Sequence, residues 1–428
     1  MEQNKTDIYV YADWKGMDSP QCIGILSAHQ TRAGRKKFSF EYDKTWLGTQ
    51  EQLVLDPDIQ WNEGVQYPNQ SVVEKVNFGV FLDSMPDRWG QTLMKRRENQ
   101  RAKEEERKPR NLYDIDFLLG VHDSHRMGGL RFKLEKDGDF LDNDSEFPTP
   151  PITTIRELQH SVELIESDVE SAEIKKHLAL LIAPGSSLGG ARPKANVLDD
   201  NGHPWIAKFP SKNDDTNKAA WEMLAYRLAL DAGINMAESR LEKAPKGYDT
   251  FLTKRFDRLD GERIHFASAM TMTGNNEDSV KMDDNAPSYL DLAEFIQYDS
   301  NASAASITED LHQLWRRIAF HVAISNTDDH LRNHGFIIDN NEWRLSPAYD
   351  INPSTEKNGL AITIDGVDSS LDLDLVKSVG EYFQLDTPQM DAIIDEIEKS
   401  VQNWRVVATE LRIPRAEQEL MSGAFLFG

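Results

Sequence analysis

A dense run of polar residues between two apolar segments constrains this chain more than any other feature. An apolar stretch over 318–324 ends a predicted helix, and residues 324–336 then read ISNTDDHLRNHGF. A hairpin is predicted to follow, with strands at 335–338 and 343–345. Polar groups placed between buried elements cost free energy unless they hydrogen-bond or bind a ligand. The loop must therefore be held in one ordered conformation, and it is the first candidate for a functional site.

Three residues in and after this loop stand at informative intervals. Asp328 and Asn333 are five positions apart, and Asp350 follows 22 positions after Asp328, beyond the predicted hairpin. Protein kinases use an Asp that accepts the proton of the substrate hydroxyl, an Asn that holds magnesium, and a second magnesium-binding Asp. Carboxylate and amide oxygens are hard ligands that suit magnesium. The spacing therefore indicates a phosphoryl-transfer site.

Two other interpretations of the loop stay open at this point. Asp and Asn commonly cap helices and fill turns, so residues 326–329 could simply end the helix. A zinc or iron site could instead be built from His321, His330 and His334 with either Asp328 or Asp329. That histidine spacing fits no recurrent metal motif, and such a site would need neither Asn333 nor Asp350.

A glycine-rich segment, PGSSLGGARPK at 184–194, is a candidate phosphate-binding loop. Gly185, Gly189 and Gly190 would let the backbone approach a phosphate, and Lys194 could complement its charge. The segment is not a Walker A motif, because Lys194 lies four positions beyond the last glycine and no Ser or Thr follows it. A flexible surface loop is the competing interpretation.

Lysine in a short apolar strand is the next unusual feature. Lys208 lies in PWIAKFP, and Glu222 on the following predicted helix is its natural partner. A strand Lys paired with a helix Glu orients the ATP phosphates in kinases. The alternative is a lysine that extends from an edge strand into solvent. Downstream, TKRFDR at 253–258 ends a strand where mixed composition gives way to helical composition, which is where a kinase-like fold would bind adenine.

The order of the predicted elements runs from β-rich through mixed to helical. Strands are predicted at 7–12, 22–28, 37–42, 195–199, 204–209 and 250–255. Helices are predicted at 87–106, 112–119, 155–166, 170–182, 217–232, 288–299, 308–326, 370–383 and 388–411. An acidic, proline-rich linker is predicted over 137–151. The predicted domains are 1–150, 151–257 and 258–428.

Charge and composition restrict the partners. The 428 residues carry 48 Lys and Arg against 72 Asp and Glu, a net charge of −24, which argues against binding nucleic acid directly. The longest apolar run, 178–183, is far shorter than a membrane span, so no membrane association is expected. The single cysteine, Cys22, excludes an intramolecular disulfide and favours a reducing, cytoplasmic location.

Seven segments, taken in order, resemble one family. MPDRWG, RMGGLRF, SLGGARPK, WIAKFP, KRFDR, NTDDHLRNHGF and LSPAYDINPS are similar to the motifs of the HipA-like serine/threonine kinases of bacterial type II toxin–antitoxin systems. The resemblance extends over nearly the whole chain, from about residue 8 to about residue 410. It implies an α+β, two-lobed protein-kinase-like fold with an additional β-rich N-terminal subdomain and a mostly helical C-terminal lobe.

The resemblance also implies roles for individual residues. Asp328 would be the catalytic base, and Asn333 and Asp350 would hold Mg²⁺. Ser187 would be the site of autophosphorylation, with Ser186 as the adjacent candidate; in the family, phosphorylation there ejects the loop and inactivates the enzyme. The residues that would bind ATP are Gly189, Gly190, Ala191, Arg192, Pro193, Lys194, Lys208, Glu222, Lys254, Phe256, His330 and Arg332.

Partners are implied in the same way. The family pairs the kinase with a small HipB-like helix-turn-helix antitoxin that binds operator DNA, so DNA contacts are expected mainly through that antitoxin. The substrate would be a protein, and characterised relatives phosphorylate aminoacyl-tRNA synthetases. The competing hypothesis is a non-catalytic, pseudokinase-like co-repressor that binds an antitoxin on DNA. The presence of Asp328, Asn333, Asp350 and Lys208 together argues against that hypothesis.

Overall fold

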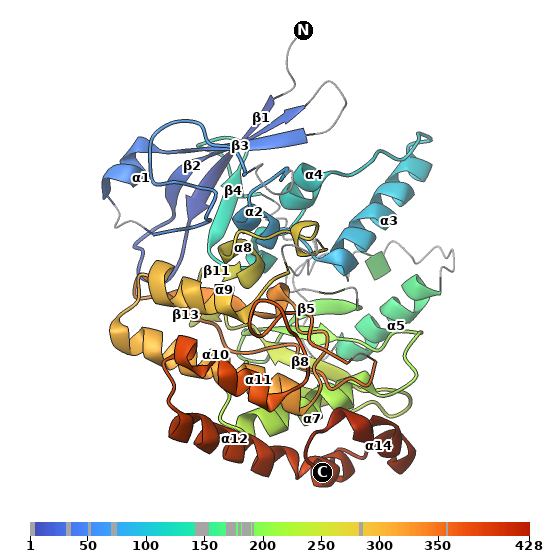
Figure 1. Ribbon diagram of the computed structural model, residues 1–428. Helices are drawn as coiled ribbons and strands as arrows, with labels where there is room; N and C mark the ends of the chain where they lie inside the picture. The colour runs from blue at the N-terminus through green and yellow to red at the C-terminus, as the bar shows by residue number, and fades with distance from the viewer. Residues whose placement is uncertain are drawn as a thin grey trace. The chain divides into compact units, whose positions relative to one another are not determined.

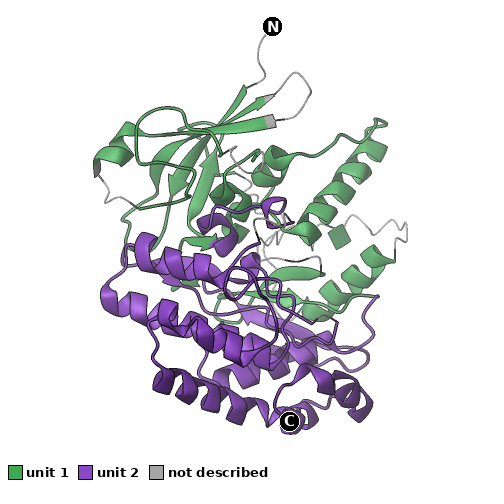
Figure 2. Ribbon diagram, viewed as in Figure 1, with its two compact units in different colours: residues 1–212, 257–267 green, residues 213–256, 268–428 purple. Residues whose placement is uncertain are grey.

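The computed structural model describes residues 5–30, 36–49, 53–69, 75–141, 154–167, 177–178, 181, 190, 192–281, 286–356 and 358–428. The chain folds into two compact units (Figure 2). Unit 1 comprises residues 1–212 and 257–267, and unit 2 comprises residues 213–256 and 268–428. The three-domain division predicted from the sequence stays a prediction. The predicted linker over 137–151 lies largely outside the described residues.

Unit 1 contains a four-stranded antiparallel sheet in the order β3-β2-β1-β4 (Figure 1). The strands are β1 (Lys5–Ala12), β2 (Gln21–Gln30), β3 (Lys36–Tyr42) and β4 (Leu130–Lys133). In β1 the side chains of Ile8, Val10 and Ala12 are fully buried, and they alternate with less buried residues. This alternation is that of a strand with one face in the core. The three N-terminal strands predicted from the sequence are confirmed.

The remaining elements of unit 1 are helices and short strands. The helices are α1 (Lys44–Thr49), α2 (Gly79–Asp83), α3 (Arg88–Glu104), α4 (Asp114–Leu119), the 3₁₀ turn η1 (Asp123–His125) and α5 (Ile155–Glu166). The strands are β5 (Lys194–Leu198), β6 (Pro204–Lys208), β9 (Arg258–Leu259) and β10 (Glu262–Arg263), and β11 (Phe266–Ser268) ends at the passage into unit 2. The strands predicted at 195–199 and 204–209 are confirmed as the antiparallel pair β5–β6.

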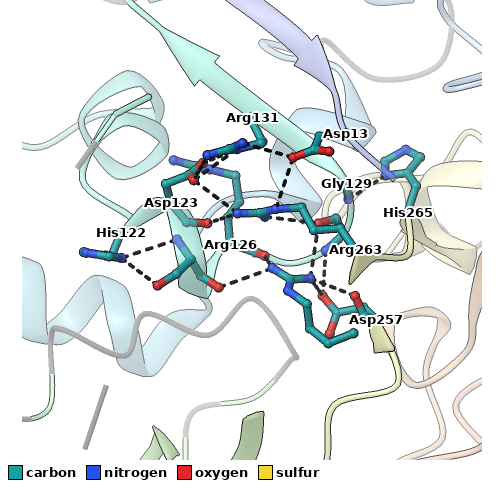
Figure 3. A network of polar contacts seen from close by, with 12 residues as sticks. Asp13, His122, Asp123, Arg126, Gly129, Arg131, Asp257, Arg263 and His265 are labelled. Carbon is teal, nitrogen blue, oxygen red and sulfur yellow. Dashed lines mark hydrogen bonds and ion pairs between the residues drawn. The ribbon is translucent and has the colours of Figure 1, made fainter. Parts of the chain in front are cut away.

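A network of arginines and aspartates in unit 1 explains the RMGGLRF segment (Figure 3). The buried carboxylate of Asp257 accepts a hydrogen bond from the Gly128 amide at 2.8 Å and pairs with Arg258 at 2.6 Å. Gly128 has a φ of +74°, and a Cβ there would lie 2.9 Å from the Phe266 amide nitrogen. The close approach of these two backbones therefore requires glycine. This motif and the Asp257–Arg258 end of KRFDR hold unit 1 together.

His265 gives unit 1 an acid-sensitive contact. Its Nδ1 accepts a hydrogen bond from the Gly129 amide at 3.3 Å, and its ring stacks on Trp14 at 5.0 Å between centroids. Burial lowers the pKa of His265 from 6.5 to about 3. Between about pH 3 and pH 6.5, His265 is therefore protonated in the unfolded chain but not in the folded protein. Stability from this group is complete above pH 6.5 and is lost as the pH falls toward 3.

We expect unit 1 to lose about 2 kcal/mol from His265 between pH 7 and pH 5. His265→Asn keeps an acceptor near the position of Nδ1 and cannot be protonated, so this part of the pH dependence should disappear. Urea unfolding of the full-length protein at both pH values measures the difference. Loss of the stack on Trp14 lowers the stability of the variant at every pH, so the readout is the difference in the free energy of unfolding between pH 7 and pH 5. The same difference in the variant as in the wild-type protein would contradict the assignment to His265.

Unit 2 is mostly helical. Its helices are α7 (Lys218–Asp231), α8 (Ala269–Met272), η3 (Ser279–Lys281), α9 (Tyr289–Glu294), the π-helical turn η5 (Phe295–Asp299), α10 (Ala304–Ala323), η6 (Leu331–Asn333), α11 (Leu373–Ser378), η7 (Gly380–Phe383), α12 (Thr387–Val401), α13 (Trp404–Glu410), α14 (Arg415–Met421) and η8 (Ser422–Ala424). Its strand pairs are the antiparallel hairpins β7 (Ser239–Glu242) with β8 (Thr250–Lys254) and β12 (Gly335–Asp339) with β13 (Glu342–Leu345). None of the described helices is long and apolar enough to cross a membrane.

Two predicted helices are each divided in the structure. The helix predicted over 370–383 is α11 followed by the separate 3₁₀ turn η7. The sequence predicts a single helix over 388–411, but the structure ends α12 at Val401 and begins α13 at Trp404. The Asn403 side chain donates to the Lys399 carbonyl at 2.9 Å, which is the local competition that makes Asn a poor helix-interior residue. The turn also lets the Trp404 ring stack on Phe425 at 4.3 Å between centroids.

Candidate active site

The polar loop of residues 325–334 follows α10, whose C-terminal half is largely buried. Within α10 the side chains of Leu314, Trp315 and Ile318 are fully buried, which fixes the helix in the core. The helix ends at Ala323, and Ser325 then takes a left-handed φ of +51° that turns the chain. The Asn326 amide returns a hydrogen bond to the His321 carbonyl at 2.9 Å. The loop therefore begins from a rigid element.

Within the loop, Asp328 and Asn333 are joined through a backbone contact. Asp328 is exposed, whereas the Asn333 side chain is buried. The Asn333 amide nitrogen Nδ2 donates to the Asp328 carbonyl at 3.2 Å. Because a carbonyl can only accept, this contact fixes which end of the amide is nitrogen. The amide oxygen, which is the atom a magnesium ion would bind, is left for another partner.

Three hydrogen bonds bring the segment around Asp350 to this loop. The Tyr349 hydroxyl donates to the Arg332 carbonyl at 2.8 Å. The Asn352 amide donates to the Asn326 side-chain oxygen at 3.3 Å. The Ser354 amide donates to the Ser325 carbonyl at 3.2 Å. These contacts lie on both sides of Asp350, so the structure gathers Asp328, Asn333 and Asp350 into one region of unit 2.

The conformation of Asp350 is itself unusual. Its φ of +58° lies in the left-handed region, which Asp tolerates better than most residues but which costs free energy. The Asn352 side chain donates to the Asp350 carboxylate at 3.3 Å. Together with the Asn333 amide oxygen, this carboxylate forms a donor set of hard oxygens. The residues present therefore fit a magnesium ion.

A second, buried carboxylate lies directly beside Asp328. Asp329 is 1% exposed, and its Oδ2 lies 2.8 Å from both His321 Nδ1 and His334 Nε2 and accepts a hydrogen bond from the Tyr289 hydroxyl. Burial opposes ionisation of this carboxyl, but the two histidines outweigh burial and hold the pKa of Asp329 well below its usual value. Burial and the adjacent Asp329 raise the pKa of Tyr289 well above its usual value. The carboxylate is therefore hydrogen-bonded to Tyr289 and His334 and lies within ion-pair distance of His321.

The cluster contains three members of the zinc or iron site considered from the sequence, namely His321, Asp329 and His334. Their separations of 2.8 Å from the carboxylate oxygen are hydrogen-bond lengths. Ligands of a tetrahedral zinc ion at about 2.0–2.1 Å from the metal would stand about 3.3 Å apart. The contacts are therefore shorter than those between ligands of one zinc ion, and those of Tyr289 and His334 are hydrogen bonds.

Unit 2 also contains Lys254, Phe256, His330 and Arg332, four of the residues predicted to bind ATP. The Lys254 amide donates to the Glu238 carbonyl at 2.7 Å, so an adenine would use the Lys254 carbonyl. The half-buried Phe256 ring packs against Tyr349 at 5.6 Å between centroids, which connects the end of the KRFDR strand to the Asp350 segment. Arg332 extends toward Glu277, with 3.6 Å between the charged atoms, and His330 is half-buried.

In unit 1, Lys194 has a partner that sequence reasoning missed. Its ammonium lies 2.9 Å from the Asp87 carboxylate, and both side chains are less than 5% exposed. The Trp89 indole donates to the Lys194 carbonyl at 3.1 Å. A Cβ on Gly190 would lie 3.3 Å from the same ammonium. The MPDRWG segment therefore holds the end of the candidate phosphate-binding loop.

Lys208 is the residue directly opposite Lys194 in the β5–β6 register. Side chains directly opposite on an antiparallel pair project to the same face, and two like charges there repel unless acids or anions offset them. Lys208 lies in unit 1 and the buried Glu222 lies on α7 in unit 2, so their pairing stays a prediction. Arg192 is half-buried and Pro193 is buried. The predicted residues Ser186, Ser187, Gly189 and Ala191 lie outside the described residues.

Several residues that hold the loop in unit 2, or Lys194 in unit 1, were not predicted in that role, and Asp329 was considered only as a possible metal ligand. They are Asp87, Trp89, Tyr289, Asn326, Asp329, Tyr349 and Asn352. Asp87 and Trp89 lie within the MPDRWG motif, and Tyr349 and Asn352 lie within LSPAYDINPS, so motif membership was a usable signal. Tyr289 carried no such signal, since its contact with the loop arises only from tertiary packing.

Comparisons with known proteins identify the family of the chain. The family model for the HipA-like C-terminal domain matches residues 186–404, which is more than half of the chain. The chain therefore belongs to the HipA-like family, as the sequence motifs predicted. None of the curated proteins matches it.

Solved structures confirm the fold class. The chain is similar to HipA of Shewanella oneidensis MR-1, solved as a toxin–antitoxin complex with HipB and its operator DNA. The TM-score is 0.65 at 17% identity, over 97% of this chain and 94% of that chain. The α+β class, with its sheet-rich N-terminal region and helical C-terminal region, is therefore confirmed. The Helicobacter pylori proinflammatory kinase CtkA is more distant, with a TM-score of 0.33 at 12% identity over 51% of this chain and 94% of that chain.

Proposed function

We propose that this chain is an ATP-dependent protein serine/threonine kinase and the toxin component of a HipA/HipB-like module. The observation that carries the proposal is the gathering of Asp328, Asn333 and Asp350 in unit 2 by hydrogen bonds on both sides of Asp350. These are the residue types that phosphoryl transfer requires, in the order in which kinases use them.

The chemistry assigned to the site is a single transfer. The oxygen of a substrate serine or threonine attacks the γ-phosphorus of ATP, and the bond to the β–γ bridging oxygen breaks to leave ADP. The Asp328 carboxylate accepts the hydroxyl proton, a role for which its exposed side chain is accessible to a protein substrate. A magnesium ion held by the Asn333 amide oxygen and Asp350 would neutralise charge on the phosphates.

Unit 1 would supply the phosphate contacts. Lys208 and Lys194 project to one face of the β5–β6 pair, and Gly190 lies beside the Lys194 ammonium. Backbone amides of a glycine-rich loop with lysines at its end form an anion site. The loop's serine, Ser187, is the proposed site of autophosphorylation. A phosphate there carries a charge of about −1.5 to −2 and would compete with ATP for the same cations.

The proposed partner is a HipB-like helix-turn-helix antitoxin. The Shewanella HipA to which the chain is similar was solved with such a partner and operator DNA. The excess of acidic residues, a net charge of −24, opposes contact with DNA phosphates, so DNA binding is assigned mainly to the antitoxin. The proposed cellular substrate is a protein of the translation machinery, with aminoacyl-tRNA synthetases as the first candidates.

Intact-mass measurement after incubation with ATP and magnesium tests the enzymatic proposal. We expect a gain of about 80 Da, the mass of one added phosphate, because transfer to the chain's own serine needs no other substrate. Peptide mapping should place the phosphate at Ser187, and Ser187→Ala should abolish the gain, with Ser186→Ala as the matched control. No gain from a preparation that still binds a HipB-like antitoxin would instead favour the non-catalytic co-repressor.

A further inference from the structure

The buried cluster of Asp329, Tyr289, His321 and His334 is given no role in the phosphoryl transfer itself. Two of its members, however, directly follow Asp328 and Asn333 in the sequence. Its carboxylate oxygen Oδ2 is approached by His321 Nδ1 and His334 Nε2 at 2.8 Å and by the Tyr289 hydroxyl. All four side chains are at most 2% exposed. Hydrogen bonds are strong where water is excluded, so those from Tyr289 and His334 favour one placement of the Asp329 carboxylate.

Tyr289 and His321 are held by two separate helices of unit 2. Tyr289 is the first residue of α9, whose start is fixed by the Ser288 cap and by a hydrogen bond from the Tyr289 amide to the Thr363 carbonyl at 3.0 Å. His321 lies in the last turn of the buried helix α10. These anchors lie outside the loop, so they can fix it relative to the core.

His334 makes a contact within the loop. His334 follows Asn333 directly, and Asp329 follows Asp328 directly. The bond from His334 Nε2 to Asp329 therefore closes the segment 329–334, which contains Asn333 and directly follows Asp328. The His334 carbonyl also accepts a hydrogen bond from the Ala269 amide at 2.9 Å, which ties this end of the loop to α8.

We propose that Asp329 is a positioning residue whose contacts with Tyr289, His321 and His334 set the placement of Asp328 and Asn333. This inference rests on the proposed kinase function and adds to it a second aspartate with a different task. Asp328 is exposed and would meet the substrate, whereas Asp329 is buried and acts only through its chain neighbours. Misplacing Asp328 should slow proton acceptance, and misplacing Asn333 should weaken magnesium binding.

Two variants test the proposal in the full-length protein. Asp329→Asn keeps the shape but removes the negative charge, so its remaining carbonyl oxygen can accept only weaker, uncharged hydrogen bonds. Tyr289→Phe removes a single donor hydroxyl. The matched controls are Asp395→Asn, an exposed position on α12, and Tyr382→Phe, at a side chain that is 61% exposed. If Asp329→Asn fails to fold, Tyr289→Phe carries the test.

Two readouts separate positioning from a merely structural role. We expect kcat for phosphate incorporation to fall about 10- to 100-fold in Asp329→Asn, as misplacement of reacting groups by about 1 Å does, with the KM for ATP nearly unchanged. We also expect a higher half-saturating magnesium concentration in the thermal shift produced by a non-hydrolysable ATP analogue. A structural role alone would lower the melting temperature and leave both quantities of the folded protein unchanged, and that result overturns the proposal.

The same measurements keep this inference distinct from the proposed function. If the wild-type protein transfers no phosphate, the kinase proposal fails, but a raised magnesium requirement in Asp329→Asn still supports positioning of Asn333. If the wild-type protein shows no magnesium-dependent shift at all, both proposals fail. Stoichiometric zinc or iron in the purified wild-type protein, lost in His321→Asn, would make the cluster a metal site and overturn the positioning role.

Discussion

Replacing Asp328 by Asn is expected to lower phosphoryl transfer about 10²- to 10⁴-fold, the usual contribution of a positioned general base. Asn has nearly the same shape but cannot accept the hydroxyl proton. Because the Asp328 side chain is exposed and the loop contact from Asn333 goes to its backbone carbonyl, the fold should be retained. The free energy of unfolding should change by no more than about 0.5 kcal/mol.

Incorporation of labelled γ-phosphate by purified Asp328→Asn, compared with wild type, measures this effect. The exposed Asp395→Asn is the matched control, since it makes the same chemical change on α12, outside the loop. Urea unfolding of each variant checks that the loss is not a loss of structure. Transfer by Asp328→Asn at the wild-type rate would remove Asp328 from the reaction. Phosphoproteomics of cells that express either form would then identify the substrate proteins.

Removing Asp87 is expected to destabilise unit 1 by about 3–5 kcal/mol, because it leaves the Lys194 ammonium buried without its carboxylate. Asp87→Ala would also remove the cap of α3, where the Asp87 side chain accepts from the Gly90 amide at 2.8 Å, at a cost of about 1 kcal/mol. Burial raises the pKa of Asp87 even though Lys194 opposes the rise, so burial outweighs the pairing for this carboxyl.

Urea unfolding of a short series of variants separates these contributions. Asp87→Ser keeps a capping oxygen and removes the charge, so its loss measures the uncompensated lysine. Combining Asp87→Ser with Lys194→Met removes both charges and should recover most of the lost stability, as paired replacement of buried ions by apolar groups commonly does. A loss of less than about 1 kcal/mol in Asp87→Ser would show that the ammonium finds another partner.

Local patterns in the chain predicted many of the elements and part of the site. The alternation in 7–12 and the turn residues around it were enough for β1, because a half-buried strand repeats every two residues. The spacing of Asp328, Asn333 and Asp350 was informative because one hairpin, β12–β13, separates the loop from Asp350. The length of this hairpin sets the number of residues between Asp328 and Asp350, so counting residues along the sequence predicts that the two segments lie close together.

Other features escaped prediction because they depend on burial. Asp328 and Asp329 are chemically identical neighbours, and nothing local shows that one meets solvent while the other meets His321 and Tyr289. The break between α12 and α13 was missed since helical periodicity continues through it. Lys194 was interpreted only as a phosphate ligand, because its buried partner Asp87 is distant in the sequence.

The sequence by itself therefore determined the family, the α+β class and the identity of the candidate reacting residues, all of which follow from short-range patterns of residue type. The tertiary structure alone decided which aspartate is exposed, which lysine is buried in an ion pair, and which side chains anchor the loop. The physical reason is that the free energy of a charge depends on its distance from water and from opposite charges. That distance is set by packing between segments far apart in the chain, as for Tyr289 and Asp329.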